Sequence, residues 1–538
     1  MNKYIKYAFA AMSLMALHTG CSDFGDVNID PEHMNEGNVP YEMVFTNAQH
    51  QALGSDWDIW RNGCIYSGQW MQHLTSIDWW WTHNLYVYSD GYSAALWDGI
   101  YSGDRGAVRD VTTVMDLWKD KDGYGIDYNI ARIMRVYTMH RLTDLYGDIP
   151  YSEAGRPGEF SYPKYDTQQD IYTDMLKELD EAQGNLASGT ASMGSHDVYF
   201  AGDASKWKKF ANSLMLRLAM RLSKVDPSTA QTWVQKAVAN GLISSNAENV
   251  KLEHPGAVTT DDSSEPYAKI FAHEDKEFFL SATFVDMLAN TKDPRLALIG
   301  CVCEDPSISI QNSAYQLGNT DPAVQKGLPG GFNNTKNSAW FIGKKHSEFN
   351  DDAYLAKYQS LYSVPNRYTY SDPTSPTFIV TYAQTQLLLA EAAVRGWVSG
   401  SASSYYENGV RAAMEQFSQF PNATKLYQEY LTPEAINDYL AANPFDGSLK
   451  QINTQYWINC FCDEYESFAN WRRSGYPELK STYDPANPYG QNASDGEIPR
   501  RFVYPSTESQ VNSAHYSEAV GRLDNGDRFT SRVWWDKK

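Results

Sequence analysis

Amphipathic helical patterns recur along most of this chain, and they restrict it to a mainly helical fold. Residues 127–145 place Ile130, Met134 and Tyr137 at the spacing of one helix face. Because side chains return to the same direction about every 3.6 residues, these apolar groups form one buried stripe. The same spacing predicts further helices over residues 168–183, 205–224, 228–240, 377–395 and 403–417.

Several of the expected helices are neighbours joined by short turns. Residues 205–224 and 228–240 are separated by Asp226-Pro227, and Ser205 is the expected N-cap of the first helix. Residues 377–395 and 403–417 are separated by a Gly-Ser turn. Stacked helical hairpins predict a tetratricopeptide-like scaffold. The strict 34-residue consensus of such repeats is absent, so we expect degenerate repeats.

Long stretches rich in Gly, Asn and Pro separate the helical segments. They cover residues 42–104, 243–275, 300–376 and 476–538. Irregular segments of this length inside a compact protein are usually functional. We therefore expect residues 41–538 to form a single helical body with ligand-binding loops.

The N-terminus carries the features of an export signal. Lys3 and Lys6 precede an uncharged, mostly apolar run over 7–17, which is too short to span a bilayer. Cys21 follows Gly20 at the expected cut site and resembles the bacterial lipobox, in which this thiol is diacylated, with palmitate as a typical acyl group. We expect residues 1–20 to be a signal peptide and 21–40 a lipidated flexible tether. The alternative is a secreted protein with an unmodified cysteine.

Charge and cysteine content exclude some classes of protein. The formal net charge of the 538 residues is −21, which argues against nucleic-acid binding, because phosphate binding needs clustered Lys and Arg. Cys460 and Cys462 lie in a stretch that we predict to be helical and buried, whereas a local disulfide between Cys301 and Cys303 stays open. No motif with metal-ligand spacing is found, and no cofactor is expected.

Four dispersed motifs carry a family resemblance. In chain order they are RIMRVYTMHRLTDLYGDIPYSEA (132–154), YAQTQLLLAEAAVRG (382–396), YWINCFCDEYESFANWRRSGYPE (456–478) and PRRFVYPSTESQVN (499–512). Their order and spacing resemble the SusD/RagB family of nutrient-binding outer-membrane lipoproteins of Bacteroidetes. Asp23 and Asp26, just after Cys21, resemble the surface-export signal of that phylum.

The resemblance implies a fold, a location and partners. Such proteins have tetratricopeptide-like helices, sit on the outer face of the outer membrane and have no catalytic activity. Each caps a TonB-dependent (SusC-like) barrel transporter and passes it an oligosaccharide or, in some members, a peptide. The helices contact the barrel, and the loops form the ligand site.

The segment Asp78-Trp79-Trp80-Trp81-Thr82-His83-Asn84 is the first candidate for ligand binding. Three consecutive tryptophans cannot all face a core in a helix or a strand, so at least one should be exposed. An aromatic face stacks on the C–H face of a sugar, while amides and carboxylates bind its hydroxyls. The resemblance assigns Trp79, Trp81 and Asn84 to the Trp-x-Trp-x-x-Asn pattern of starch-binding members.

Further candidates extend this set. Tyr86 and Tyr88 follow the tryptophans; the resemblance also implies an upstream Asp and Arg, for which Asp56 and Arg61 are candidates, and a contribution from Arg367 and Tyr368. Alternatively, the tryptophans pack the loop onto the helices, as we expect for Trp60 and Trp70, and Arg367-Tyr368 is a surface pair. We expect Arg472 and Arg473 to pair with acidic neighbours, and the Gly147 turn to be structural.

Three other functions compete with glycan delivery. One is peptide binding within the same family. Another is a surface glycoside hydrolase, which needs two suitably spaced carboxylates that sequence alone cannot exclude. No Gly-x-Ser-x-Gly, His-Glu-x-x-His or P-loop pattern is present. The third is an adhesin or interaction scaffold of solenoid type.

Overall fold

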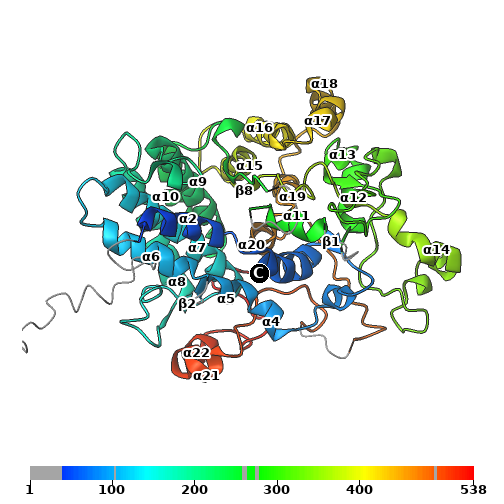
Figure 1. Ribbon diagram of the computed structural model, residues 1–538, viewed down its shortest axis with the longest axis horizontal. Coiled ribbons are helices and arrows are strands. Elements are labelled where there is room, and N and C mark those ends of the chain that lie inside the picture. The colour runs from blue at the N-terminus through cyan, green and yellow to red at the C-terminus, as the bar shows by residue number, and fades with distance from the viewer. Residues whose placement is uncertain (1–38, 102–104, 257–262, 273–277, 490–493) are drawn as a thin grey trace, which may run out of the picture.

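The computed structural model describes residues 39–101, 105–256, 263–272, 278–489 and 494–538. The predicted signal peptide, Cys21 and nearly all of the predicted tether lie outside these residues. The described chain is mainly helical, with a few two-stranded ladders (Figure 1). The predicted fold class is therefore confirmed. None of the described helices is both long and apolar enough to cross a membrane.

The N-terminal half forms a stack of helices that fills the left of Figure 1. The helices that pack in succession are α2 (Tyr41–Gln51), α6 (Ala107–Trp118), α7 (Gly125–Tyr146), α8 (Gln168–Asn185), α9 (Ala204–Arg221) and α10 (Pro227–Asn240). The expected helices over 127–145 and 168–183 are confirmed. Gly147 is the C-cap of α7, and its φ of 89° favours a residue without a side chain. This agrees with the expectation that the Gly147 turn has a structural role.

The hairpin of α9 and α10 shows how the sequence sets helix ends. Asp203 caps α9 by accepting from the amides of Ser205 and Lys206, so the prediction of Ser205 as N-cap is wrong by two residues. Asp226 caps α10, and Pro227 occupies its first turn, where a missing N–H costs no hydrogen bond. The predicted pair of helices is confirmed.

A second hairpin joins α15 (Tyr382–Val394) to α16 (Ala402–Glu415). The prediction of a helix beginning at residue 377 is wrong, because β8 (Thr377–Val380) pairs with β4 (Val250–Leu252). The apolar, β-branched run of β8 meets the helix at Thr381, whose side chain forms a capping box with Gln384. The ladder connects the segment after α10 to the start of α15.

A third hairpin joins α19 (Leu449–Asn459) to α20 (Glu464–Ser474). Cys460 and Cys462 lie in the turn between these helices, so the prediction that they are helical is wrong. Cys462 has a φ of 65°, which no α-helix contains. Cys460 is fully buried, as predicted, whereas Cys462 is half-buried.

Shorter elements carry the loops of the molecule. The prediction of an irregular segment over 42–104 is wrong in part, because helical turns occupy much of it. Further helical elements include α3 (Asp56–Asp58), the π-helical η1 (Ile59–Gly68), the 3₁₀ turn η2 (Trp81–Leu85), α4 (Asp90–Ser93), α5 (Ala95–Tyr101), α11 (Pro266–Phe271), α12 (Ala282–Asn290), α13 (Leu296–Ile299), α14 (Asp352–Lys357), α17 (Thr424–Tyr430), α18 (Pro433–Ala442), α21 (Glu508–Val511) and α22 (Ser513–Gly521).

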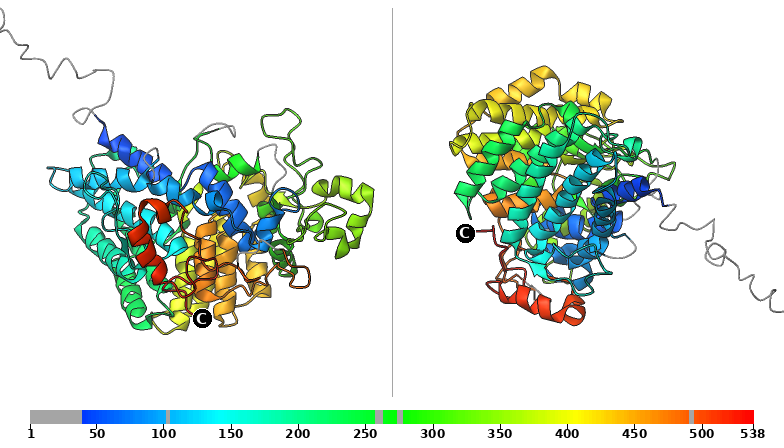
Figure 2. Two further views of the ribbon diagram at one scale, coloured as in Figure 1. Left: turned by 90° about the horizontal axis from the view of Figure 1, so that it is seen from below. Right: turned by 90° about the vertical axis from the view of Figure 1, so that its left-hand side faces the viewer.

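Three further ladders fasten loops that are distant in sequence. They are β1 (Leu74–Thr75) with β5 (Phe279–Leu280), β2 (Ile149–Pro150) with β3 (Tyr165–Asp166), and β6 (Gly300–Cys301) with β7 (Val364–Pro365), all antiparallel. Figure 2 shows α21 and α22, in red, on the outside of the body. A large hydrophobic core runs from Phe45 to Trp535, and Trp70 is fully buried in it, as expected.

Buried ion pairs join the helices of this core. The guanidinium of Arg473 on α20 donates to both carboxylate oxygens of Glu391 on α15, at 2.6 and 2.8 Å, and both side chains are fully buried. Burial alone would raise the pKa of Glu391, but Arg473 and Arg395 hold it at about 2. The expectation of an acidic partner is thus confirmed for Arg473. It is wrong for Arg472, which donates to backbone carbonyls.

We expect Glu391→Gln to lower the free energy of unfolding by about 3–5 kcal/mol, because it leaves the buried Arg473 guanidinium without its counter-charge. Since the folded-state pKa of Glu391 lies below its unfolded value of about 4.3, its contribution is present above that value and is lost as the pH falls toward 2. Denaturant unfolding between pH 2 and 7 should therefore show a shallower acid slope in the variant. The exposed Glu429→Gln is the control; equal stability of both variants would contradict the prediction.

Candidate functional site

The three consecutive tryptophans lie on a loop that leads into η2. Trp79 is 73% exposed, and Trp80 and Trp81 are half-buried. The prediction that at least one of them is exposed is confirmed. The side chains of Trp80 and Trp81 enter two separate aromatic clusters, one on each side of the loop.

The first cluster consists of Trp81, Trp340 and Tyr489, which we call the Trp81 platform. The ring centroids of Trp81 and Trp340 are 5.8 Å apart, with planes inclined by 37°. Tyr489 is nearly perpendicular to both, with centroid distances of 5.5 and 5.1 Å. The indole N–H of Trp340 donates to the carbonyl of Asn487, which fixes the two loops to one another. All three rings are half-buried, so part of each meets solvent.

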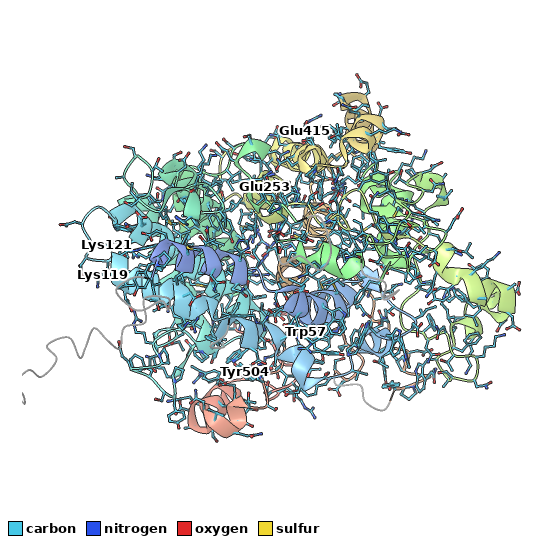
Figure 3. All side chains as sticks on the ribbon, in the orientation of Figure 1. Trp57, Lys119, Lys121, Glu253, Glu415 and Tyr504 are labelled. Atoms are coloured by element: carbon cyan, nitrogen blue, oxygen red, sulfur yellow. The ribbon has the colours of Figure 1, made fainter. Side chains whose placement is uncertain are left out.

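The second cluster lies against η1. Trp80 packs edge-on against Trp60 at 5.2 Å, and Trp60 lies 5.1 Å from Trp57. Trp57, which is labelled in Figure 3, is 51% exposed. The guanidinium of Arg61 covers the Trp57 ring at 4.1 Å, a cation–π contact. The packing role expected for Trp60 is confirmed.

The structure places the two upstream candidates, Asp56 and Arg61, beside this second cluster. Asp56 lies 3.2 Å from the ammonium of Lys269. Burial lowers the pKa of Arg61, and the electrostatic effects of Tyr92 and Asp58 act in the opposite direction. Burial also lowers the pKa of His83 to about 4, so its imidazole is neutral at pH 7 and packs as an aromatic ring against Tyr92.

Asn84 and Tyr86 face inward and hold the loops that form the platform. The Asn84 amide donates to the Ser76 carbonyl at 3.1 Å, and the hydroxyl of Thr482 donates to the Asn84 carbonyl. The Tyr86 hydroxyl accepts from the amide of Thr482 at 3.1 Å. Both side chains are almost fully buried. Both residues therefore hold the loops in position, and a direct contact of either side chain with a ligand stays a prediction.

A glycine supports the loop that carries Trp340. Gly331 has a φ of 84°, and a Cβ at this position would lie 2.7 Å from the carbonyl oxygen of Thr482. This approach brings residues 330–341 against residues 481–489, the segments that supply Trp340 and Tyr489. Only a residue without a side chain fits here without moving one of the two loops.

Arg367 is taken up by internal hydrogen bonds. Its guanidinium donates to the carbonyls of Pro306 at 2.7 Å and Gln316 at 2.5 Å, and it lies 4.3 Å from the centre of the Tyr315 ring. Because Arg367 is 3% exposed, the alternative of a surface pair is wrong. The half-buried Tyr368 packs on the core. The sulfurs of Cys301 and Cys303 lie 3.8 Å apart as thiols.

Trp340 and Tyr489 are candidate site residues that the sequence did not indicate. Each is a single aromatic residue within a long Gly-, Asn- and Pro-rich loop. Their position beside Trp81 depends on contacts between segments more than 140 residues apart, such as the bond from Trp340 to Asn487. The only feature of the sequence that could indicate these two residues is that each is an isolated aromatic residue in a polar loop.

The arrangement is suited to binding an extended, hydroxyl-rich ligand. Flat aromatic faces take the apolar ring faces of such a ligand, while its hydroxyls need hydrogen-bonding partners. Across the part of the chain that the structure describes, no group of three or more His, Cys, Asp and Glu side chains could hold a metal ion.

Comparison with known proteins gives a family and several similar structures. Residues 34–505 match the SusD-like family described as starch-binding and associating with the outer membrane. A solved chitin-binding protein shares 30% identity, with a TM-score of 0.76, over 93% of this chain and all of its own. A Bacteroidetes SusD-like structure shares 28% (TM-score 0.79), with the same coverage. A chitin-binding SusD homologue from Flavobacterium johnsoniae shares 25% (TM-score 0.69), over 93% and 99%. The comparison with curated proteins gives no match.

We expect Gly331→Ala to destabilise the protein more than Gly447→Ala. Both glycines have a φ of 84°, so both substitutions cost about 1–2 kcal/mol for the left-handed backbone. No atom lies within 4 Å of a Cβ at Gly447, whereas at Gly331 the Thr482 carbonyl must move, which adds about 1–3 kcal/mol. Denaturant unfolding measures the difference. Equal losses in the two variants would show that the loops are not tightly apposed.

Proposed function

Because this chain belongs to the SusD-like family of starch-binding proteins that associate with the outer membrane, we propose that it is a surface lipoprotein that captures oligosaccharides. In this proposal it passes them to a TonB-dependent, SusC-like barrel transporter and carries out no catalysis itself. Solved relatives that bind chitin support glycan as the ligand class.

The observation that carries this proposal is the Trp81 platform beside the exposed Trp79. Trp79 is 73% exposed, so a ligand that covers its ring removes a large apolar surface from water. The ring loses few contacts within the protein when it binds. Trp81, Trp340 and Tyr489 present three ring surfaces at different inclinations next to it. Successive sugar units of one chain can stack on such a set.

We propose a β-linked N-acetylglucosamine oligosaccharide as the first ligand to test. Two similar structures, at 30% and 25% identity, are those of chitin-binding proteins. The family description favours a starch-type glucan as the second ligand. A peptide is the third, because aromatic platforms also bind apolar side chains. The Asp56, Arg61 and Trp57 group lies at the other side of the Trp79 loop, where a longer chain would reach it.

Membrane attachment rests on Cys21, which lies outside the described residues. We propose that its thiol is acylated after export and that residues 22–40 connect the lipid to the body. Two or three acyl chains give firm attachment, since each buried methylene contributes about 0.8 kcal/mol.

We expect Trp81→Ala combined with Trp340→Ala to weaken binding of chitin hexasaccharide by at least 2 kcal/mol, the size of a recognition hot spot. Trp79→Ala should weaken it by about 1 kcal/mol or more, because this ring stacks from one side only. Isothermal titration calorimetry with the body beginning near Asp23 measures both, and maltohexaose serves as the starch-type ligand.

The control is Trp233→Ala, which removes a half-buried tryptophan on α10, outside the site. Its glycan affinity should equal that of the wild type. Unchanged affinity in the platform variant would place the glycan elsewhere on the body. Release of new reducing ends from either oligosaccharide would favour the alternative of a glycoside hydrolase.

We expect Cys21→Ser to release the protein from the outer membrane, because a serine hydroxyl is not a substrate for thiol acylation. Fractionation should move the protein from the membrane to the soluble pool, and mass spectrometry of the wild-type N-terminal peptide should show the acyl groups. A Cys64→Ser variant is the control, since Cys64 is buried in the folded body. Membrane retention of Cys21→Ser would argue against the lipid anchor.

A further inference from the structure

A cavity of about 380 Å³ lies between the segment after the tryptophans and the C-terminal segment. Its lining includes Tyr88, Asp495, Tyr504, Tyr516, Arg528 and Phe529. Tyr504 is labelled in Figure 3, next to α21 and α22. None of these residues belongs to the Trp81 platform. The volume falls in the usual range of small-molecule sites, about 300–1,000 Å³.

Aromatic side chains form much of the cavity wall. Tyr88 and Phe529 lie edge-on at 5.8 Å, and Tyr504 and Tyr516 do so at 6.0 Å. Phe529 and Tyr504 are buried, whereas Tyr88 is 37% exposed and Tyr516 is half-buried. The wall therefore has a fixed inner part and a solvent-facing rim of two tyrosine rings.

The polar groups of the cavity are held in defined positions. Asp527 accepts from the hydroxyl of Tyr516 at 3.1 Å and from a guanidinium N–H of Arg501 at 2.5 Å. Asp90 accepts from the Tyr88 hydroxyl at 2.9 Å and from the amide and hydroxyl of Ser506 at 2.9 and 2.8 Å. These bonds fix the two tyrosine rings without the help of a ligand.

Two exposed charged groups complete the lining. Asp495 and Arg528 are both solvent-facing, and within the described ranges neither side chain makes a salt bridge. A carboxylate and a guanidinium provide acceptors and forked donors, which together match neighbouring hydroxyls on a sugar ring.

The cavity shares its supports with the Trp81 platform. The hydroxyl of Ser481 donates to the Gly496 carbonyl at 2.6 Å, and its oxygen lies 3.2 Å from the Tyr86 hydroxyl. Tyr86 is two residues before Tyr88, and Gly496 is next to Asp495. These contacts therefore join the segment that supplies Tyr489 of the Trp81 platform to the segments that line this cavity.

We propose that this cavity is a second saccharide subsite, which takes one or two sugar units between the rings of Tyr88 and Tyr516. Asp495 and Arg528 bind the hydroxyls of that sugar, and the tyrosine rings cover its apolar face. The ligand class rests on the proposed function, but the residues that line the subsite are different from those of the Trp81 platform.

The test uses the body beginning near Asp23 with the Trp81→Ala/Trp340→Ala platform variant as background. Calorimetry with chitin hexasaccharide and maltohexaose should show weak residual binding of at least one of them. Adding Tyr88→Ala or, separately, the exposed Arg528→Ala should reduce that residual affinity at least tenfold. Tyr162→Ala, which removes a 62%-exposed tyrosine elsewhere, should leave it unchanged. A crystal soaked with the bound oligosaccharide should show sugar density between Tyr88 and Tyr516.

The outcomes separate the two proposals. Loss of all binding in the platform variant overturns the second subsite and leaves the proposed function standing. Full affinity in the platform variant, abolished by Tyr88→Ala and Arg528→Ala, supports the subsite and refutes the Trp81 platform as the main site. Residual binding that neither substitution changes also overturns the subsite, as does wild-type protein that binds neither oligosaccharide.

Discussion

The buried carboxylate of Glu466 on α20 joins parts of the chain that lie more than 240 residues apart. It pairs with Arg221 and, at 3.7 Å, with Arg217, both on α9, and Arg221 lies 3.5 Å from Asp144 on α7. All four side chains are fully buried, so each charge depends on its partners to offset lost hydration. Burial alone would raise the pKa of Glu466, but the two guanidinium groups lower it, which keeps the network ionised at neutral pH. The position of α20 is thereby fixed on the N-terminal helices.

The position of α20 in turn determines where the binding loops can run. On α20, Arg472 precedes Arg473 and donates to the carbonyl of Arg500. The indole N–H of Trp471 donates to the carbonyl of Pro477. These bonds set the direction of the chain as it leaves α20 toward Thr482 and Tyr489. The helical scaffold therefore positions the aromatic site through the loop that leaves α20. Loss of the buried ion pairs would displace the Trp81 platform although none of its tryptophans belongs to those pairs.

The helices could be predicted because their signal is local, whereas the site is assembled from distant segments. The apolar stripe of Ile130, Met134 and Tyr137 predicts a helix from the spacing of neighbouring residues alone. The exposure of at least one of three consecutive tryptophans likewise follows from their positions in sequence. The start of α15 was misplaced because the strand Thr377–Val380 continues the apolar run of the helix, and its pairing with β4 is not visible in its own residues. Trp340 could not be assigned for the same reason. The alternative of a surface position for Arg367 fails because carbonyls of the 306–316 loop supply enough acceptors to bury it.

The buried positions of Asn84 and Tyr86 bear on affinity, because both residues hold the loops that carry the aromatic rings. Binding is weakened by the entropy lost when loops and side chains become ordered. Here the three loops are already joined by the Thr482 bonds to Asn84 and Tyr86 and by the close approach at Gly331. The rings of Trp81, Trp340 and Tyr489 can therefore receive a sugar with little further ordering. Exposed aromatic surface of this kind usually marks an interaction site. When the loops beneath it are already rigid, more of the free energy of burying that surface contributes to affinity.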